Sequence, residues 1–160
     1  MLEAREHAEA RGATPVAKLS GVLSGLSDRS EGAAAKLAGG QWAALSDQIH
    51  DRPLAVISGA CGSGPITHEE EAFLTGIAEG GQDLAVRGTG RAIGHSLESS
   101  FLANAVIAIG CLERRAIFPP LSPEAAVEAR VETAEVDQVL VTGWGYLQGE
   151  GMALLEATDG

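Results

Sequence analysis

Apolar and polar positions follow two periods along this chain, and each period predicts one kind of element. Runs with strand composition cover 15–25, 54–58, 84–87, 127–133, 139–142 and 152–157. Segments with helical spacing cover 3–11, 31–49, 67–78 and 96–112. Because strands alternate with helices, the pattern predicts an α/β layered fold with the core order βαβαβαββ.

Three of these segments carry more detail. The run Leu54–Ser58 is apolar without a break, which is typical of a strand buried on both faces. The segment Ser96–Leu112 is apolar on nearly every side, which predicts a helix buried all round. Such a helix needs more cover than one sheet provides, so we expect a three-layer or five-layer body with a second half in a longer chain or a partner. Thr67 with Glu70 three positions later is a capping-box pattern, and Glu69–Glu71 is expected to be a solvated helix start.

Composition excludes several classes of function. The net charge of −11 argues against binding to nucleic acid and to anionic membrane surfaces, because both need clustered Lys and Arg. The longest apolar run is too short to span a bilayer. Cys61 and Cys111 lack metal-binding spacing, so we expect two buried thiols, no metal and no cofactor. The charged, helical N-terminus does not resemble a signal peptide, and we expect a cytoplasmic protein.

The glycine-rich stretch Gly88–Gly94 leads into His95, and the apolar helix is expected to follow at once. An imidazole at a helix N-terminus lies in a positive field that disfavours the imidazolium form. A neutral imidazole can donate one N–H to a developing oxyanion. His95 could instead be only a polar capping residue beside a turn.

Four ordered segments resemble the C-terminal half of a β-ketoacyl-[acyl-carrier-protein] synthase, a condensing enzyme of the thiolase fold. They are Leu2–Ala13, Ile57–Phe73, Gly94–Leu97 with Phe118–Pro120 after it, and the glycine-rich Gly143–Gly151. The second segment resembles the stretch around the family's His-Gly-Thr-x-Thr-Pro motif, and the third resembles its Gly-His-Thr-Leu motif. The resemblance covers essentially all 160 residues. It implies a thiolase-like layered fold for 1–160, with a mixed sheet, flanking helices and a buried central helix.

The family condenses acyl groups with a malonyl-carrier in fatty acid or related acyl-chain synthesis. It uses a cysteine nucleophile, two histidines that stabilise an enolate, and a lysine. The resemblance implies that His95 is the second, catalytic histidine, and that Gly94, Phe101, Gly145 and Tyr146 contact the substrate. The cysteine belongs to an N-terminal half that we expect to be absent from this sequence. Implied partners are an acyl-carrier protein and the N-terminal half or a partner synthase subunit, with a dimer as the intact protein.

The sequence departs from the family pattern at several positions. Ala60 stands where the first histidine belongs, and Arg87 and Arg91 are the cations nearest to the place of the lysine. We therefore expect weakened or lost condensing activity, with a non-catalytic subunit like the chain-length factors as the alternative. A small acidic binding module is the third class, and the ordered motifs disfavour it. Cys61 could be a replacement nucleophile or a buried thiol, and His68 is expected to be solvated.

Overall fold

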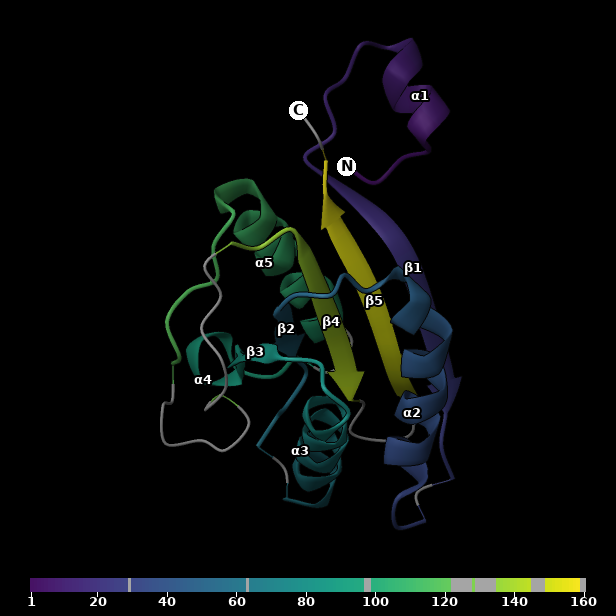
Figure 1. Ribbon diagram of the computed structural model, residues 1–160, viewed down its shortest axis with the longest axis vertical. Coiled ribbons are helices and arrows are strands. Elements are labelled where there is room, and N and C mark those ends of the chain that lie inside the picture. Colours follow the sequence, from purple (N-terminus) through teal and green to yellow (C-terminus); the bar gives the residue numbers. More distant parts are fainter. Residues whose placement is uncertain are drawn as a thin grey trace.

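The computed structural model describes residues 1–28, 30–62, 64–96, 99–121, 128, 135–144 and 149–158. These residues form three layers, with helices on both faces of one five-stranded sheet (Figure 1). The strands are β1 (Ala17–Leu26), β2 (Leu54–Ser58), β3 (Leu84–Gly88), β4 (Gln138–Trp144) and β5 (Gly149–Ala157). The helices are α1 (Arg5–Ala10), α2 (Ala33–Leu45), α3 (Gly64–Glu79), α4 (Gly90–Ile93) and α5 (Ser100–Arg114), with a 3₁₀ turn η1 (Ser46–Gln48). Apart from Glu128, the strand expected at 127–133 lies outside the described residues.

The sheet is mixed, and its strand order is β1-β5-β4-β2-β3. Strand β2 pairs in parallel with β3 and β4, whereas β5 is antiparallel to both β4 and β1. The order βαβαβαββ is confirmed. The carboxyl ends of β2, β3 and β4 therefore meet along one edge of the sheet, where β1 ends and β5 begins.

Two hydrophobic clusters lie on opposite faces of the sheet, as the two-residue period of strands requires. The face under α2 and α3 is formed by Val56, Val86, Leu140 and Leu154. The face under α5 is formed by Ala55, Ile57, Val139, Val141 and Leu155. All five residues of β2 are buried, which confirms the prediction from its unbroken apolar run.

Helix α3 begins at Gly64, so the predicted cap at Thr67 is wrong. Pro65 explains the earlier start, because proline has no N–H to leave unpaired and its φ already suits the first helical turn. The buried positions of α3 are Glu70, Phe73, Leu74 and Ile77, which share one face of the helix. The expectation that Glu69–Glu71 is solvated is therefore wrong for Glu70.

Helix α5 begins at Ser100, four residues later than predicted, and packs one stripe of side chains against the sheet. The stripe consists of Asn104, Ala108, Cys111 and Leu112. On another side of the helix, Leu102 is 67% exposed and Val106 is 68% exposed. The prediction of burial on every side is wrong for this chain alone, because the described residues cover only part of the helix.

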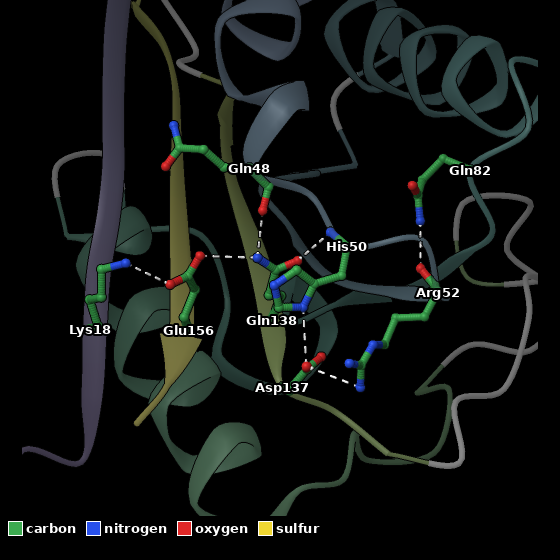
Figure 2. Close-up of polar contacts among 8 residues, drawn as sticks. All are labelled: Lys18, Gln48, His50, Arg52, Gln82, Asp137, Gln138 and Glu156. Carbon is green, nitrogen blue, oxygen red and sulfur yellow. Dashed lines mark hydrogen bonds and ion pairs between the residues drawn. The ribbon is translucent and has the colours of Figure 1, made fainter. Parts of the chain in front are cut away.

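A polar cluster joins the start of β4 to neighbouring elements, at the end of the sheet away from the β4 carboxyl end (Figure 2). The buried Gln138 side chain accepts a hydrogen bond from the His50 amide (2.8 Å). It also donates to the Gln48 carbonyl (2.7 Å) and to Glu156 Oε1 (3.0 Å). Lys18 on β1 donates to the other Glu156 oxygen (2.8 Å). These contacts connect β1, β5 and β4 to the segment that leads into β2.

Candidate functional site

A cavity of about 390 Å³ opens at the carboxyl end of β4. It lies between the second half of β1, the start of β5 and the first turns of α5. A cavity of this size suits a small organic ligand. Its lining combines apolar side chains, five glycines and a few polar groups: Val22, Leu23, Ser24, Gly25, Leu26, Gly59, His95, Ser100, Phe101, Asn104, Thr142, Gly143, Trp144, Gly149, Glu150 and Gly151.

His95 is half-buried in the wall of this cavity. Its Nε2 atom is closed off from solvent and makes no hydrogen bond to the described residues. A buried polar atom without a partner typically costs about 1–3 kcal/mol.

The local geometry around His95 differs from the prediction. Helix α5 starts at Ser100, so His95 is not its first residue, and the field of the helix end is not what acts on the ring. The Ser96 carbonyl accepts hydrogen bonds from the amides of Ser99 (2.9 Å) and Ser100 (2.8 Å), which form a separate turn. Gly94 has a φ of 71°, which favours glycine, and it is not among the residues that line the cavity. Gly94 therefore shapes the backbone that presents His95.

Phe101 lines the cavity and packs directly on the backbone of β4. A Cβ atom at Gly143 would lie 2.8 Å from Phe101 Cδ2, which is closer than packed atoms approach. The absence of a side chain at Gly143 therefore lets the ring lie where it does. The structure thus brings together His95 and Phe101, two residues that the sequence placed at the site.

Behind this wall lies Glu70 of α3, whose side chain is fully buried. Its Oε1 atom accepts hydrogen bonds from the Ser58 hydroxyl (2.9 Å), the Gly59 amide (3.2 Å) and the Thr142 hydroxyl (2.5 Å). The Gly59 amide is also directed at Thr142 Oγ1 (2.9 Å). Glu70 Oε2 is enclosed and makes no hydrogen bond of normal geometry with the described residues. Since Gly59 and Thr142 both line the cavity, Glu70 supports its wall from behind.

Burial raises the pKa of Glu70 to about 7, because a carboxylate loses its hydration there. Hydrogen bonds from Thr142, Ser58 and Gly59, together with the Trp144 indole, act in the opposite direction and are outweighed. The group therefore changes its charge near neutral pH.

A second buried polar side chain, Asn104, connects α5 to the same region. Its Oδ1 accepts a hydrogen bond from the Thr89 hydroxyl (2.5 Å), and its amide donates to the Ser58 carbonyl (3.2 Å). Sequence reasoning missed both Glu70 and Asn104. The signal was present, because each is a polar residue on the buried stripe of its helix.

The other residues singled out from the sequence lie around the cavity or away from it. Ala60 follows β2 in the turn that begins at Gly59, and its carbonyl would lie 3.0 Å from a Cβ at Gly90. Cys61 is half-buried, not buried, and α3 begins three residues after it, although no such helix start was expected. Arg87 is buried on β3 and donates to the Phe118 carbonyl (2.6 Å), so it does not line the cavity.

Other residues that the sequence analysis named lie outside the described part of the chain or away from the cavity. Gly145, Tyr146 and the side chain of Arg91 lie outside the described residues. Cys111 is buried as predicted, and burial raises the pKa of its thiol. His68 is exposed, as expected. Within the described residues, no group of three His, Cys, Asp or Glu side chains could hold a metal ion, and no helix there is long and apolar enough to cross a membrane.

No family model and no curated protein matches this sequence. Solved structures do match. An oxazolomycin ketosynthase domain from Streptomyces albus has a TM-score of 0.77 and 18% identity, covering 96% of this chain and 48% of that chain. The ishigamide ketosynthase/chain length factor has a TM-score of 0.76 and 18% identity. The match covers 98% of this chain and 42% of that chain.

A third match is a type II polyketide synthase acyl-carrier protein in complex with its ketosynthase. It has a TM-score of 0.77 and 18% identity, covering 98% of this chain and 42% of that chain. This chain therefore spans less than half the length of the three solved chains described. The resemblance found in the sequence is confirmed at the level of fold: the chain has the α/β fold of the thiolase-like ketosynthases, over one part of their length.

Proposed function

We propose that this chain is the C-terminal half of a β-ketoacyl-[acyl-carrier-protein] synthase homologue. In this proposal its cavity holds an acyl group, and His95 donates a hydrogen bond to the reacting carbonyl. The observation that carries the proposal is the place of His95 in the wall of a largely apolar cavity, with an enclosed Nε2 atom that makes no hydrogen bond to the described residues. The cavity lies at the carboxyl edge of a ketosynthase-type sheet, where open α/β sheets bind their ligands.

The chemistry needs a donor aimed at an oxygen that becomes negatively charged. When a malonyl group loses CO2, the electron pair of the broken bond forms an enolate whose oxygen requires fixed N–H donors. The His95 ring could supply one such donor. Ala60, at the place of the family's first histidine, cannot supply the second. We therefore propose slow condensation or none, with acyl binding retained.

The proposal also names what covers the exposed apolar face of α5. Leu102 and Val106 on α5 lie exposed, as do Val22 (55%) and Leu26 (79%) on β1. Apolar surface of this kind marks an interface. Because the matched ketosynthases are more than twice as long as the part this chain covers, we propose that the other half of the ketosynthase fold packs there. That half would also bring the nucleophilic cysteine.

The proposed partner that delivers the acyl group is an acyl-carrier protein. One matched ketosynthase was solved with its carrier. The resemblance implies that the helix with Arg5 and Arg11 lies near the place where the carrier docks, but Arg11 pairs with Glu3 (Nε to Oε2, 3.1 Å). This pairing occupies the positive charge, so we propose weak, salt-sensitive docking. A role in fatty acid or related acyl-chain synthesis and a location in the cytoplasm are also parts of the proposal.

A second candidate is a non-catalytic subunit like a chain-length factor, which pairs with an active synthase. Ala60 favours it, because the first histidine position carries no donor. The fold does not separate the two, since one match is itself a ketosynthase/chain length factor pair. The Ala60→His variant of the assembled protein distinguishes the two candidates. In a condensing enzyme it should raise the rate of malonyl decarboxylation on the order of 10²-fold. In a non-catalytic subunit it should leave that rate unchanged.

The test of the proposed function is titration of the chain with S-octanoyl-N-acetylcysteamine, a neutral acyl thioester, by calorimetry. We expect saturable binding to the wild type and about tenfold weaker binding to His95→Ala, from the loss of one hydrogen bond. The matched control is His68→Ala, which removes an exposed histidine and should bind like the wild type. Absence of binding to the wild type, or equal binding to His95→Ala, contradicts the proposed function.

A further inference from the structure

The residues that hold Glu70 are also wall residues of the cavity. Gly59 and Thr142 line the cavity and place hydrogen-bond donors on Glu70 Oε1, at 3.2 and 2.5 Å. Ser58 donates to the same oxygen (2.9 Å) and accepts from the Ala60 amide (3.0 Å), so the turn after β2 is held through it. One carboxyl oxygen thus joins the ends of β2 and β4 to α3.

We propose that Glu70 is a positioning residue of the cavity. In its ionised form Glu70 holds the Ser58–Ala60 turn against the end of β4. When Glu70 is protonated, this part of the cavity wall rearranges. The affinity of the cavity for its ligand therefore changes with the charge of the Glu70 carboxyl group. The link to acyl ligands rests on the proposed function, whereas the movement of the wall does not.

The two charge states differ in the number of donors they can accommodate. A carboxylate only accepts hydrogen bonds, and three donors converge on Oε1. A protonated carboxyl group must itself donate one bond. If the carboxyl O–H donates a hydrogen bond to Thr142 Oγ1, the Thr142 hydroxyl must donate to an acceptor other than Glu70. If the proton stays on Oε2, that oxygen needs an acceptor which the described residues do not supply at normal geometry. The first arrangement changes the wall residue Thr142, and the second leaves a buried O–H group without an acceptor, which a movement of the wall would relieve.

Glu70 is the ionisable side chain where the ends of β2 and β4 meet α3, and the ionisable side chains that line the cavity itself are His95 and Glu150. Strands β2 and β4, which provide Ser58 and Thr142 as donors to Glu70, carry no ionisable side chain. Helix α2, which also packs against α3, carries only the exposed Lys36. The groups that shift the pKa of Glu70 are hydroxyls, an amide and an indole, all of them neutral. Burial brings that pKa to about 7, so the change falls near neutral pH.

The first test needs no ligand. Amide resonances of Gly59 and Thr142 are followed by NMR from about pH 5 to about pH 9 in the wild type, Glu70→Gln and Glu71→Gln. Glutamine keeps the shape of the side chain but cannot ionise. Glu71 is the matched control, because it is the next residue of the same helix and is only half-buried. We expect both resonances to titrate near neutral pH in the wild type and in Glu71→Gln, and to stay constant in Glu70→Gln.

The second test repeats the thioester titration over the same pH range. We expect the affinity of the wild type and Glu71→Gln to change severalfold with a midpoint near neutral pH, and that of Glu70→Gln to stay constant. If Glu70→Gln does not fold, Thr142→Val is used instead. The Thr142 hydroxyl donates a hydrogen bond that lowers the pKa of Glu70. Its removal should therefore raise that pKa and move the midpoint of the Gly59 titration to higher pH.

The outcomes separate the two proposals. Gly59 and Thr142 resonances that do not titrate, or that titrate equally in Glu70→Gln, overturn the positioning role. So does a thioester affinity that is independent of pH in the wild type. Absence of thioester binding at every pH overturns the proposed function, and the ligand-free titration still decides whether Glu70 controls the wall.

Discussion

Replacement of Glu70 by glutamine should change how the stability of the protein depends on pH. The carboxyl group has an ordinary pKa of 4.5 when exposed, and burial raises the pKa to about 7 in the folded protein. The folded state therefore holds its proton more tightly than the unfolded chain. The resulting stabilisation is complete below about pH 4.5 and is lost as the pH rises towards 7. Above that pH the carboxyl group is ionised in both the folded and the unfolded protein. It then contributes nothing further to the pH dependence of the free energy of unfolding.

The size of the effect follows from the interval between the two pKa values. At about 1.4 kcal/mol per pH unit, the interval from 4.5 to about 7 corresponds to about 3 kcal/mol. This is a large fraction of the stability of a domain of this size. Glutamine occupies the same volume and remains neutral. The stability of Glu70→Gln should therefore not decrease in this way between about pH 5 and about pH 8.

The assay is urea unfolding of the wild type, Glu70→Gln and the control Glu71→Gln at closely spaced pH values. The free energy of unfolding of the wild type and Glu71→Gln should fall by about 2–3 kcal/mol more than that of Glu70→Gln across this range. Parallel curves for the wild type and Glu70→Gln would refute the reasoning. They would mean that Glu70 keeps an ordinary pKa in the folded protein.

Three further predictions concern other parts of the molecule. Gly143→Val should abolish thioester binding in calorimetry, because its Cβ would lie 2.8 Å from Phe101 Cδ2. The control Gly76→Ala on α3 should bind normally, because Gly76 does not line the cavity and its Cβ would meet nothing within 4 Å. Because the exposed apolar side chains of α5 lack cover in this chain alone, we expect it to self-associate. Leu102→Lys should reduce this association in size-exclusion chromatography with light scattering, and an unchanged elution profile would argue against an interface on α5. Gln138→Leu should lower the free energy of unfolding in urea by about 1–3 kcal/mol, because it leaves part-buried hydrogen-bond partners unpaired, and a loss below about 0.5 kcal/mol would contradict this.

The sequence predicted the elements whose residues have one dominant physical role. The apolar run of β2 could form only a buried strand, and the alternation of strands and helices determined the layered class. The ends of the helices were less predictable. The start of α3 depends on Pro65, and the turn before α5 depends on hydrogen bonds from Ser99 and Ser100 to the Ser96 carbonyl, which no periodicity reveals.

The site was predicted in part. His95 and Phe101 line one cavity, as the resemblance implied, but their chemical roles stay predictions. Glu70 was misread because three consecutive glutamates resemble a solvated helix start. Its burial follows from the stripe it shares with Phe73, Leu74 and Ile77 once the helix start is known. The partners on β2 and β4 that stabilise its carboxyl group are distant in sequence, so only the fold reveals them.

The central claim is that the cavity beside His95 holds an acyl group, and the most direct test is a crystal structure of the chain with S-octanoyl-N-acetylcysteamine. We predict that the acyl chain lies against Phe101 and the end of β1, with the thioester carbonyl oxygen at about 2.7–3.2 Å from a ring nitrogen of His95. A thioester bound at another surface, or a cavity that stays empty at a saturating concentration, would contradict the account.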